Sequence, residues 1–406
     1  MMTREKDIDA IAGGITAADG FRAAAVSCGV KAEALDLALI VSDGPASAAG
    51  VFTTNHTVAA PVVVCRDHLE RSAGIGRAIA VNSGCANACT GAAGMAVARE
   101  MADAVATSVV CPVEQALVAS TGVIGVPLDI TKVRSGITTA FDRLDRASNQ
   151  AAAEAIMTTD PWPKETAVRV RTPAGSFVVG GMAKGSGMIE PKMATMLAFL
   201  TTDASIDPER LRQALVSVTN ETFNAITVDG ECSTNDSVFL LANGASGVKV
   251  DDAVYPFFVA GLTEVCSQLA REIVRGGEGA TKLVSIRVTG ATTNDEAKRA
   301  ALAIANSPLV KTALHGGDPN WGRLVAVAGR AGVGFDPGRA RVRIGPAVLY
   351  ENETVWADRE PDAAEHMRGT EVDVEVGLGT PGDAEATVLT CDLSAEYVRI
   401  NADYRT

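Results

Sequence analysis

The stretch KGSGMIEPKMATMLAFLTTDA, residues 184–204, joins a polar bend to a smooth apolar run. Gly185, Gly187 and Pro191 favour a sharply turned backbone. The apolar residues that follow are typical of a fully buried strand, and Thr195 opens that strand. We therefore expect Thr195 at the junction of a bend and a buried strand, and the surrounding sequence indicates which fold holds that junction.

Buried strands are also predicted well before this stretch. They are expected at 34–42 (ALDLALIVS), 77–84 (RAIAVNSG) and 116–125 (ALVASTGVIG). The first two end in polar or glycine turns, and the third breaks into a tight loop at Thr121-Gly122.

Two helices stand out by their apolar spacing. After TGAAG, apolar residues recur every fourth position at Val97, Met101, Val105 and Val109. A second helix begins after Asp207, which can cap it with Pro208 at the first position. The apolar face of this second helix consists of Leu211, Ala214, Leu215 and Val218.

The C-terminal third alternates apolar and polar residues with period two. The segments are 284–291 (VSIRVTGA), 340–345 (ARVRIG) and 373–394 (DVEVGLGTPGDAEATVLTCDLS). Such alternation is typical of half-exposed strands. Strands and helices thus mix along the whole chain, which predicts a layered α/β or α+β protein without a boundary readable from composition.

Length and charge limit the possible functions. The 406 residues exceed the usual size of one core, so two lobes are expected. The net charge of −13, without a basic run, argues against nucleic acid and anionic membranes as partners. The N-terminal stretch has no apolar leader, and about 18 uncharged apolar residues never occur in a row. We therefore expect a cytoplasmic protein.

The cysteines and histidines give little support to a metal site. The eight cysteines lie among apolar or small residues, as free thiols in a reducing compartment do. Cys85 and Cys89 form a C-x-x-x-C pair, but no second ligand pair accompanies them and the chain has four histidines. Neither a metal nor a cofactor is expected.

Common catalytic and nucleotide motifs are absent or misplaced. The G-x-G-x-x-G at 377–382 runs from one alternating strand into another, so a hairpin turn fits it better than a dinucleotide site. No Walker sequence, H-E-x-x-H or G-x-S-x-G occurs. His315 is the best histidine candidate for a site, but a loop histidine bonded to its neighbours is the simpler interpretation.

Short polar clusters recur at the predicted strand ends. They are NSGCANACTG, STGVIG, IMTTD, KGSGM, ATML, GECSTND, GGEGATK and HGGDPNWGR. Each alone is typical of a turn, but their number predicts a shared cleft at one edge of a sheet.

A reaction without a metal, cofactor or catalytic histidine favours a nucleophile that carries its own base. An N-terminal threonine does so, because its α-amine has a pKa of about 7.7–8.0 and can accept the Oγ proton. Thr195 becomes terminal only if the Ala194–Thr195 bond is cut, and its own Oγ can attack that carbonyl. The alternative is a loop that simply enters a strand.

The 184–204 stretch resembles the self-cleavage region of the ornithine acetyltransferase family, also called glutamate N-acetyltransferase, of arginine biosynthesis. The other matching segments occur in family order from about residue 20 to 406. They are NSGCANACTG, STGVIG, AIMTTDPWPKE, DGECSTNDSVFLLANG, GEGATKLVSIRVTGA, NSPLVKTALHGGDPNWGR and YVRINADYRT. The resemblance implies a layered α/β/β/α sandwich with a smaller second lobe.

The resemblance also implies roles for individual residues. The chain would cut itself into an α chain, 1–194, and a β chain, 195–406, which form one intertwined unit, commonly as α2β2. Thr195 would be the nucleophile, with Thr121 and Gly122 as the oxyanion hole. The implied substrate-binding positions are Thr158, Lys184, Thr195, Glu278, Asn401 and Thr406. Lys184 suits a carboxylate and Glu278 an ammonium group.

The implied reaction moves an acetyl group from N-acetylornithine to glutamate through an ester on Thr195, with acetyl-CoA as a further possible donor. Lys192 departs from the family pattern, where an amide or small residue is more common. Three alternatives stay open. They are an aminopeptidase or amidohydrolase like the β-peptidyl aminopeptidases, an uncleaved and silent amino-acid-binding protein, and a paralogue that acetylates a specialised amine.

Overall fold

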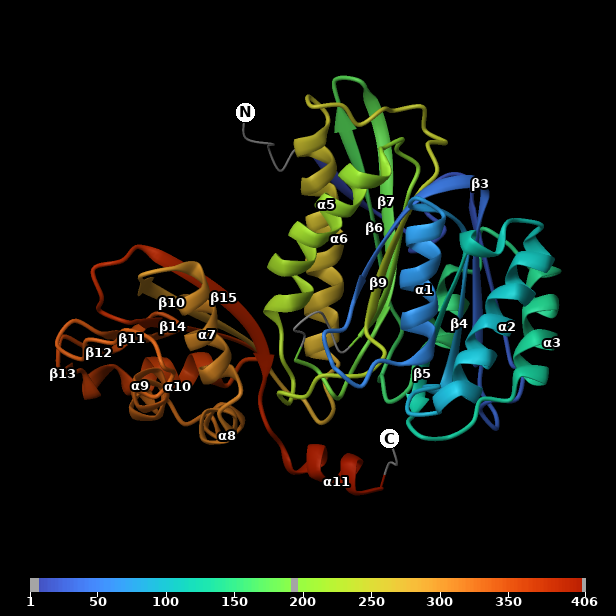
Figure 1. Cartoon of the computed structure of the whole chain (residues 1–406). Helices are drawn as coiled ribbons and strands as arrows, with labels where there is room; N and C mark the ends of the chain where they lie inside the picture. The colour runs from blue at the N-terminus through green and yellow to red at the C-terminus, as the bar shows by residue number, and fades with distance from the viewer. Residues whose placement is uncertain (1–6, 191–195, 404–406) are drawn as a thin grey trace.

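The computed structural model describes residues 7–190 and 196–403, and Figure 1 shows how their helices and strands are layered. Nine strands form the main sheet in the order β1-β6-β7-β8-β9-β3-β4-β5, with β2 paired to β3. Their bounds are β1 Ile8–Ile11, β2 Phe21–Val26, β3 Leu37–Phe52, β4 Ile75–Cys85, β5 Ala116–Val123, β6 Lys164–Thr172, β7 Gly175–Lys184, β8 Leu197–Thr202 and β9 Ser237–Ala242.

The long strand β3 folds this sheet into two layers. Its first half pairs with β2 and β4, and its second half pairs with β9. Between them, the pairing with β4 shifts between Val41 and Ala46, around Gly44-Pro45. The predicted strand at 34–42 therefore does not end at its polar turn. It bends there and continues, because both halves find partner strands for their backbone groups.

Helices cover both outer faces of the folded sheet. On one side lie α5 (Pro208–Glu221) and α6 (Tyr255–Arg275), and on the other α1 (Ala60–Arg71), α2 (Gly91–Val109) and α3 (Ile130–Phe141) (Figure 1). The short helix α4 (Asn149–Ala155) contacts strands of both layers. The expected α/β/β/α sandwich is confirmed.

Local sequence signals explain the two predicted helices. Asp207 caps α5 by accepting a hydrogen bond from the Glu209 N–H, with Pro208 at the first helical position. All four predicted apolar residues of α5 are buried, and so are Met101, Val105 and Val109 of α2. Both predictions are confirmed.

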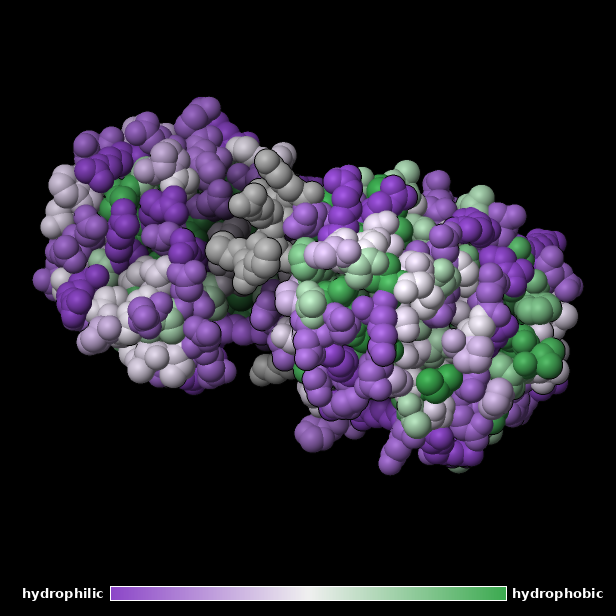
Figure 2. All heavy atoms as spheres, turned by 90° about the horizontal axis from the view of Figure 1, so that it is seen from above, coloured by the Kyte–Doolittle hydropathy of each residue, from purple (hydrophilic) through white to green (hydrophobic). Residues whose placement is uncertain are grey.

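The smaller lobe is a six-stranded sheet with its own core. The strand order is β13-β12-β11-β14-β10-β15, and β10 and β14 are parallel. The strands are β10 Leu283–Ala291, β11 Arg341–Ile344, β12 Ala347–Glu351, β13 Thr354–Val355, β14 Glu371–Gly377 and β15 Ala384–Cys391. The helices are α7 Asn294–Ala305, α8 Pro308–Gly316, α9 Trp321–Gly329 and α10 Glu360–Met367. In Figure 2 the smaller lobe and the main sandwich are seen as two masses side by side.

The period-two segments all fall in this smaller sheet, as half-exposed strands should. The G-x-G-x-x-G does connect two strands, β14 and β15, but the hairpin prediction is wrong. β10 lies between them and pairs with both. The loop therefore crosses over a strand, a long-range arrangement that alternation along one segment does not encode.

The C-terminal helix α11 (Ala395–Asp403) lies apart from both sheets below the main body (Figure 1). None of its residues is buried. Short 3-10 turns occur at Val113–Gln115, Phe223–Ala225 and Ala357–Arg359. In the described part of the chain, no helix is long and apolar enough to span a bilayer.

Candidate active site

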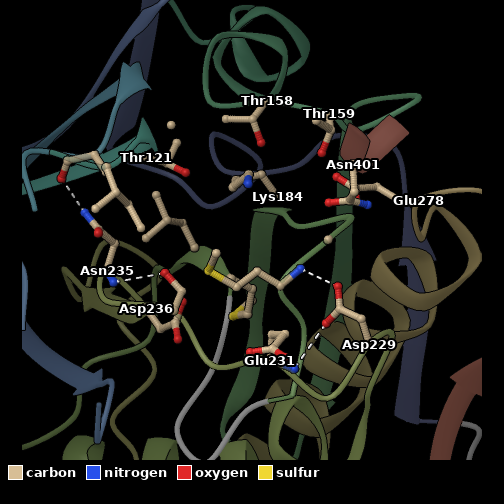
Figure 3. Close-up of a pocket in the computed structure, with 18 of the residues that line it drawn as sticks. Thr121, Thr158, Thr159, Lys184, Asp229, Glu231, Asn235, Asp236, Glu278 and Asn401 are labelled. Atoms are coloured by element: carbon tan, nitrogen blue, oxygen red, sulfur yellow. Dashed lines mark hydrogen bonds between the residues drawn. The ribbon is translucent and has the colours of Figure 1, made fainter. Parts of the chain in front are cut away.

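A pocket of about 140 Å³ opens where strand ends of the main sheet meet α11 and the start of the smaller lobe (Figure 3). Seven of the eight polar clusters predicted to share a cleft contribute to it. The lining residues are Ala86, Thr121, Gly122, Ile124, Thr158, Thr159, Lys184, Gly187, Met188, Met196, Leu197, Asp229, Glu231, Ser233, Asn235, Asp236, Glu278, Tyr397 and Asn401. The eighth cluster does not line it: His315 Nδ1 donates to the Asp392 carboxylate over 2.7 Å, as a histidine bonded to its neighbour.

Thr121 and Gly122 end β5 at an irregular point of the sheet. The register of β5 against β4 shifts at Gly84 and Cys85, so that Cys85 faces both Thr121 and Val123. Such bulges turn backbone groups out of the ladder. Gly122 has φ +125°, and a Cβ there would lie 2.4 Å from the Gly84 carbonyl carbon. Glycine is therefore required at this position.

Buried amides hold this irregular edge in place. Asn235 donates from Nδ2 to the Ala86 and Ser120 carbonyl oxygens, at 2.6 and 2.8 Å. Asn82 Nδ2 donates to the Cys85 carbonyl, and Ser120 Oγ donates to Asn82 Oδ1. These bonds join β4, β5 and the segment before β9, so the Thr121-Gly122 corner is rigidly supported from both sides.

Lys184 ends β7 beside a buried carboxylate. Its Nζ lies 3.9 Å from Asp160 Oδ2, and its side chain is 10% exposed. Asp160 also accepts a 2.6 Å bond from Lys164 Nζ, and both of those side chains are fully buried. Burial raises the pKa of Asp160, but Lys184, Lys164 and the bonds to it outweigh burial and lower that pKa to about 2. Asp160 is therefore ionised.

Glu278 also lines the pocket and is buried, with 6% exposure. Its Oε2 accepts a 2.7 Å bond from Asn401 Nδ2 of α11. Gly187 packs directly on this carboxyl group, because a Cβ at Gly187 would lie 2.4 Å from Glu278 Cδ. Figure 3 shows Thr158, Thr159, Asn401 and Glu278 along one side of the pocket. A buried carboxylate here is suited to an ammonium group.

Asp229 clamps the chain just before the gap in the described residues. It accepts hydrogen bonds from the backbone N–H groups of Met188 and Ile189, at 2.7 and 2.8 Å. Met188 has φ +58°, a strained value for a residue with a side chain. Tyr397 of α11 donates its hydroxyl to the same carboxylate over 3.2 Å. Burial and Asp229 raise the pKa of Tyr397, so the hydroxyl keeps its proton.

Asp236 holds the backbone at Met196, where the described residues resume. Its carboxyl group accepts a hydrogen bond from the backbone N–H of Met196, and Ser237 N–H donates to the Met196 carbonyl. Asp236 is 2% exposed; Ser233 also donates a hydrogen bond to its carboxyl group, and among the described residues Oδ2 has no hydrogen-bond partner. Burial raises the pKa of Asp236 well above its usual value, and nearby Cys232 adds to this shift.

The structure brings together most of the sequence-predicted site residues. Thr121, Gly122, Thr158, Lys184, Glu278 and Asn401 all line the pocket. Ala194, Thr195, Lys192 and Thr406 lie outside the described residues. Met196 and Leu197, which follow Thr195 in the sequence, do line the pocket.

Four further residues of the site were not singled out from the sequence: Asp160, Asp229, Asp236 and Tyr397. Asp160 and Asp236 are the last residues of the clusters IMTTD and GECSTND, so their segments were found but not their roles. All eight cysteines are free thiols, and the described residues contain no group of acidic, histidine and cysteine side chains that could hold a metal.

Comparison with known proteins identifies the family. Residues 22–406 match the ArgJ family. The chain belongs to that family. The arginine biosynthesis bifunctional protein ArgJ of Gloeobacter violaceus is 47% identical over 98% of this chain and 100% of that protein. The ArgJ protein of Bacillus thuringiensis subsp. konkukian is 43% identical over 97% of both chains.

Two solved structures of the family are also similar. ArgJ from Bacillus halodurans is 39% identical, covers 50% of this chain and 97% of its own, and has a TM-score of 0.48. Ornithine acetyltransferase from Mycobacterium tuberculosis, complexed with ornithine, is 40% identical, covers 46% of this chain and 98% of its own, and has a TM-score of 0.42.

Proposed function

We propose that this ArgJ-family chain is a glutamate N-acetyltransferase of arginine biosynthesis. It transfers the acetyl group of N-acetylornithine to glutamate through an ester on Thr195. The observation that carries this proposal is the convergence of Thr121, Gly122, Thr158, Lys184, Glu278 and Asn401 on one pocket beside Met196. Relatives over nearly the full length of the chain bear the name arginine biosynthesis bifunctional protein.

The pocket supplies opposite charges for an amino-acid substrate. The ammonium of Lys184 pairs with the α-carboxylate, and the carboxylate of Glu278 pairs with an ammonium group of the substrate. A substrate held at both ends is oriented for attack, which removes much of the entropic part of the barrier. Both N-acetylornithine and glutamate carry a carboxylate for Lys184, so one site serves both half-reactions.

The transfer proceeds in two acyl steps. The α-amine of Thr195 accepts the Oγ proton while Oγ attacks the acetyl carbonyl, and ornithine leaves as the amine with that proton. Glutamate then attacks the ester, and N-acetylglutamate leaves while Oγ regains a proton. In each step the carbonyl oxygen becomes negative, and Thr121 and Gly122 donate hydrogen bonds to it. Loss of one such donor costs about 10²–10³ in rate.

The α-amine requires prior cleavage between Ala194 and Thr195. β8 and β9 lie between β7 and β3, so two strands from 195–406 are inserted between strands from 1–194 in one sheet. Cleavage thus leaves an α chain and a β chain that stay together through buried strand pairing. Assembly as cytoplasmic α2β2, and use of acetyl-CoA as a second donor, are further parts of the proposal.

The first experiment is an intact-mass spectrum of freshly purified protein, followed by an acetyl-exchange assay between N-acetylornithine and glutamate. We expect two chains, one beginning at Thr195, whose masses sum to the 41.8 kDa of the full chain plus one water. Thr195→Ala is expected to remain uncut and to lose at least about 10³-fold in exchange rate. Thr195→Ser, which keeps a hydroxyl, is the matched control and should retain measurable cleavage and exchange.

Three results contradict this proposal. A single 41.8 kDa species that binds amino acids without acetylating them indicates the silent binding protein. Release of free acetate without transfer to glutamate indicates a hydrolase. Near-normal exchange by Thr195→Ala rules out the threonine ester.

A further inference from the structure

We propose that Asp160 is a positioning residue for acetyl transfer: it places the ammonium of Lys184 for the substrate carboxylate and joins the two loops around it. The inference rests on the proposed function, because it takes Lys184 as the group that receives that carboxylate. Asp160 itself does not line the pocket and so acts through Lys184.

Each oxygen of the Asp160 carboxylate serves one backbone N–H and one lysine. Oδ1 accepts a hydrogen bond of 2.7 Å from the Gly185 N–H and one of 2.6 Å from Lys164 Nζ. Oδ2 accepts a hydrogen bond of 3.1 Å from the Thr158 N–H and lies 3.9 Å from Lys184 Nζ. One buried carboxylate therefore ties the Thr158 loop to the end of β7, where Lys184 stands.

The two lysines differ in the hydrogen-bond donors that remain available to a ligand. Lys164 is fully buried and hydrogen-bonded to Asp160, so it serves to neutralise the carboxylate. Lys184 is held electrostatically at 3.9 Å, beyond hydrogen-bond distance, and makes no hydrogen bond through Nζ in the described part of the chain. Its ammonium carries three donors, which leaves them available to a ligand that enters the pocket.

The charge balance around Lys184 favours an anionic ligand. The charged groups that act on it are Asp160, Lys164, Glu278 and Asp236, and Lys31 lies near enough to repel it. Asp160 is hydrogen-bonded to Lys164 and Glu278 to Asn401, so neither carboxylate accepts a hydrogen bond from Lys184 Nζ in the described part of the chain, and a substrate carboxylate supplies that acceptor. Buried unpaired charge is costly, and ligand binding relieves this cost.

This arrangement predicts opposite effects of two neighbouring substitutions on the pKa of Lys184. Burial lowers that pKa, Asp160 raises it, and Lys164 lowers it. Asp160→Asn should therefore lower the pKa of Lys184, and Lys164→Met should raise it. The double variant Asp160→Asn/Lys164→Met should fall between wild type and Asp160→Asn, because Asp160 acts more strongly on Lys184 than Lys164 does.

The experiment follows kcat/KM for N-acetylornithine against pH in the matured enzyme. Deprotonation of Lys184 ends carboxylate binding and sets an alkaline limb. Asp160→Asn should move this limb down by about one to three pH units, the effect of losing a charge about 4 Å away. Its KM at pH 8 should rise about tenfold or more, as expected when a charged hydrogen bond is weakened, with a smaller change in kcat.

A merely structural role predicts another pattern. Asp160→Asn leaves Lys164 buried without a partner and can therefore destabilise the fold, whereas removal of both ions of a buried pair is often nearly neutral. If Asp160 only supports the fold, the double variant recovers both the stability and the pH profile of wild type. If Asp160 acts on Lys184, the double variant recovers stability while its alkaline limb stays below that of wild type.

A second readout needs no enzymatic activity. An amine-selective reagent modifies deprotonated Lys184, and peptide mass spectrometry gives the pH at which that modification begins. From the lowest to the highest, this pH should follow the order Asp160→Asn, the double variant, wild type and Lys164→Met. The same pH in all four proteins, or a shift of this pH in the same direction for both single variants, overturns the inference. The same order in a protein without acetyl exchange would refute the proposed function alone.

Discussion

Two buried aspartates that both act on Lys184 show how one residue type can have opposite pKa shifts. Asp160 is surrounded by two lysines and two backbone N–H groups, which hold its pKa low although it is buried. Asp236 accepts hydrogen bonds from Ser233 and from the Met196 N–H, its Oδ2 has no partner among the described residues, and burial raises its pKa. The difference lies in the neighbours and not in the residue type.

The raised pKa of Asp236 predicts a pH-dependent cost to stability. A folded-state pKa above the unfolded value of about 3.9 stabilises the fold at low pH, and this contribution is lost as pH rises toward the folded value. Asp236→Asn carries no such proton. Its free energy of unfolding relative to wild type should therefore increase with pH, by up to about 1.4 kcal/mol per unit.

The measurement is the difference in Tm between Asp236→Asn and its parent at pH 5 and at pH 8. Both proteins carry Thr195→Ala, so that neither is cut. Asp103→Asn, an exposed site on α2, is the control and should show a constant difference. Parallel Tm curves for Asp236→Asn and its parent would show that Asp236 is ionised in the fold.

At the scale of elements, α11 differs from every other long helix by having no buried residue between Ala395 and Asp403. It is attached through polar contacts, from Tyr397 to Asp229 and from Asn401 to Glu278. A helix that buries no apolar side chain contributes little hydrophobic stabilisation. Its contacts instead lie on the pocket and on the clamp of Met188, which indicates a role in substrate binding.

A chain that ends at Ser394 should therefore keep its stability and lose affinity. We expect a Tm within about 2–4 °C of the full-length protein, the shift that about 1 kcal/mol produces. KM for N-acetylornithine should rise about tenfold or more, because the Glu278 carboxylate loses its charged hydrogen bond to Asn401. Val398→Ala, at an exposed position of α11, is the control and should behave as wild type. A truncated enzyme with an unchanged KM would contradict this assignment.

At the scale of the whole molecule, the smaller lobe has a hydrophobic core of its own. Leu349 on β12 lies in that core, whereas Leu39 on β3 lies in one of the two apolar clusters of the main sandwich. Separate cores are expected to open as separate units under native conditions.

Cavities in the two cores should thus have local effects. Leu349→Ala and Leu39→Ala should each cost about 2–5 kcal/mol, since both side chains are fully buried. Hydrogen exchange should accelerate mainly in 283–391 for Leu349→Ala and mainly in the main sandwich for Leu39→Ala. Exchange that rises equally in both lobes for either variant would show one cooperative unit.

The sequence by itself predicted the elements that carry a strong local pattern, and the polar residues at their ends. The cap at Asp207, the four-residue spacing in α2 and the period-two strands of the smaller lobe are local signals. They act through backbone torsions and through the burial of one face, which neighbouring residues encode. The polar clusters were recognisable as loops for the same reason, and the family resemblance assigned six of the pocket residues.

Only the tertiary structure decided which of these loops meet and in what state. β3 continues through its predicted turn, and β10 separates β14 from β15, because strand order depends on partners distant in the chain. Asp160 and Asp236 lie in sequence clusters of similar polarity. Their opposite pKa shifts arise from groups up to about 50 residues away, since electrostatic energy depends on distance in space and on burial.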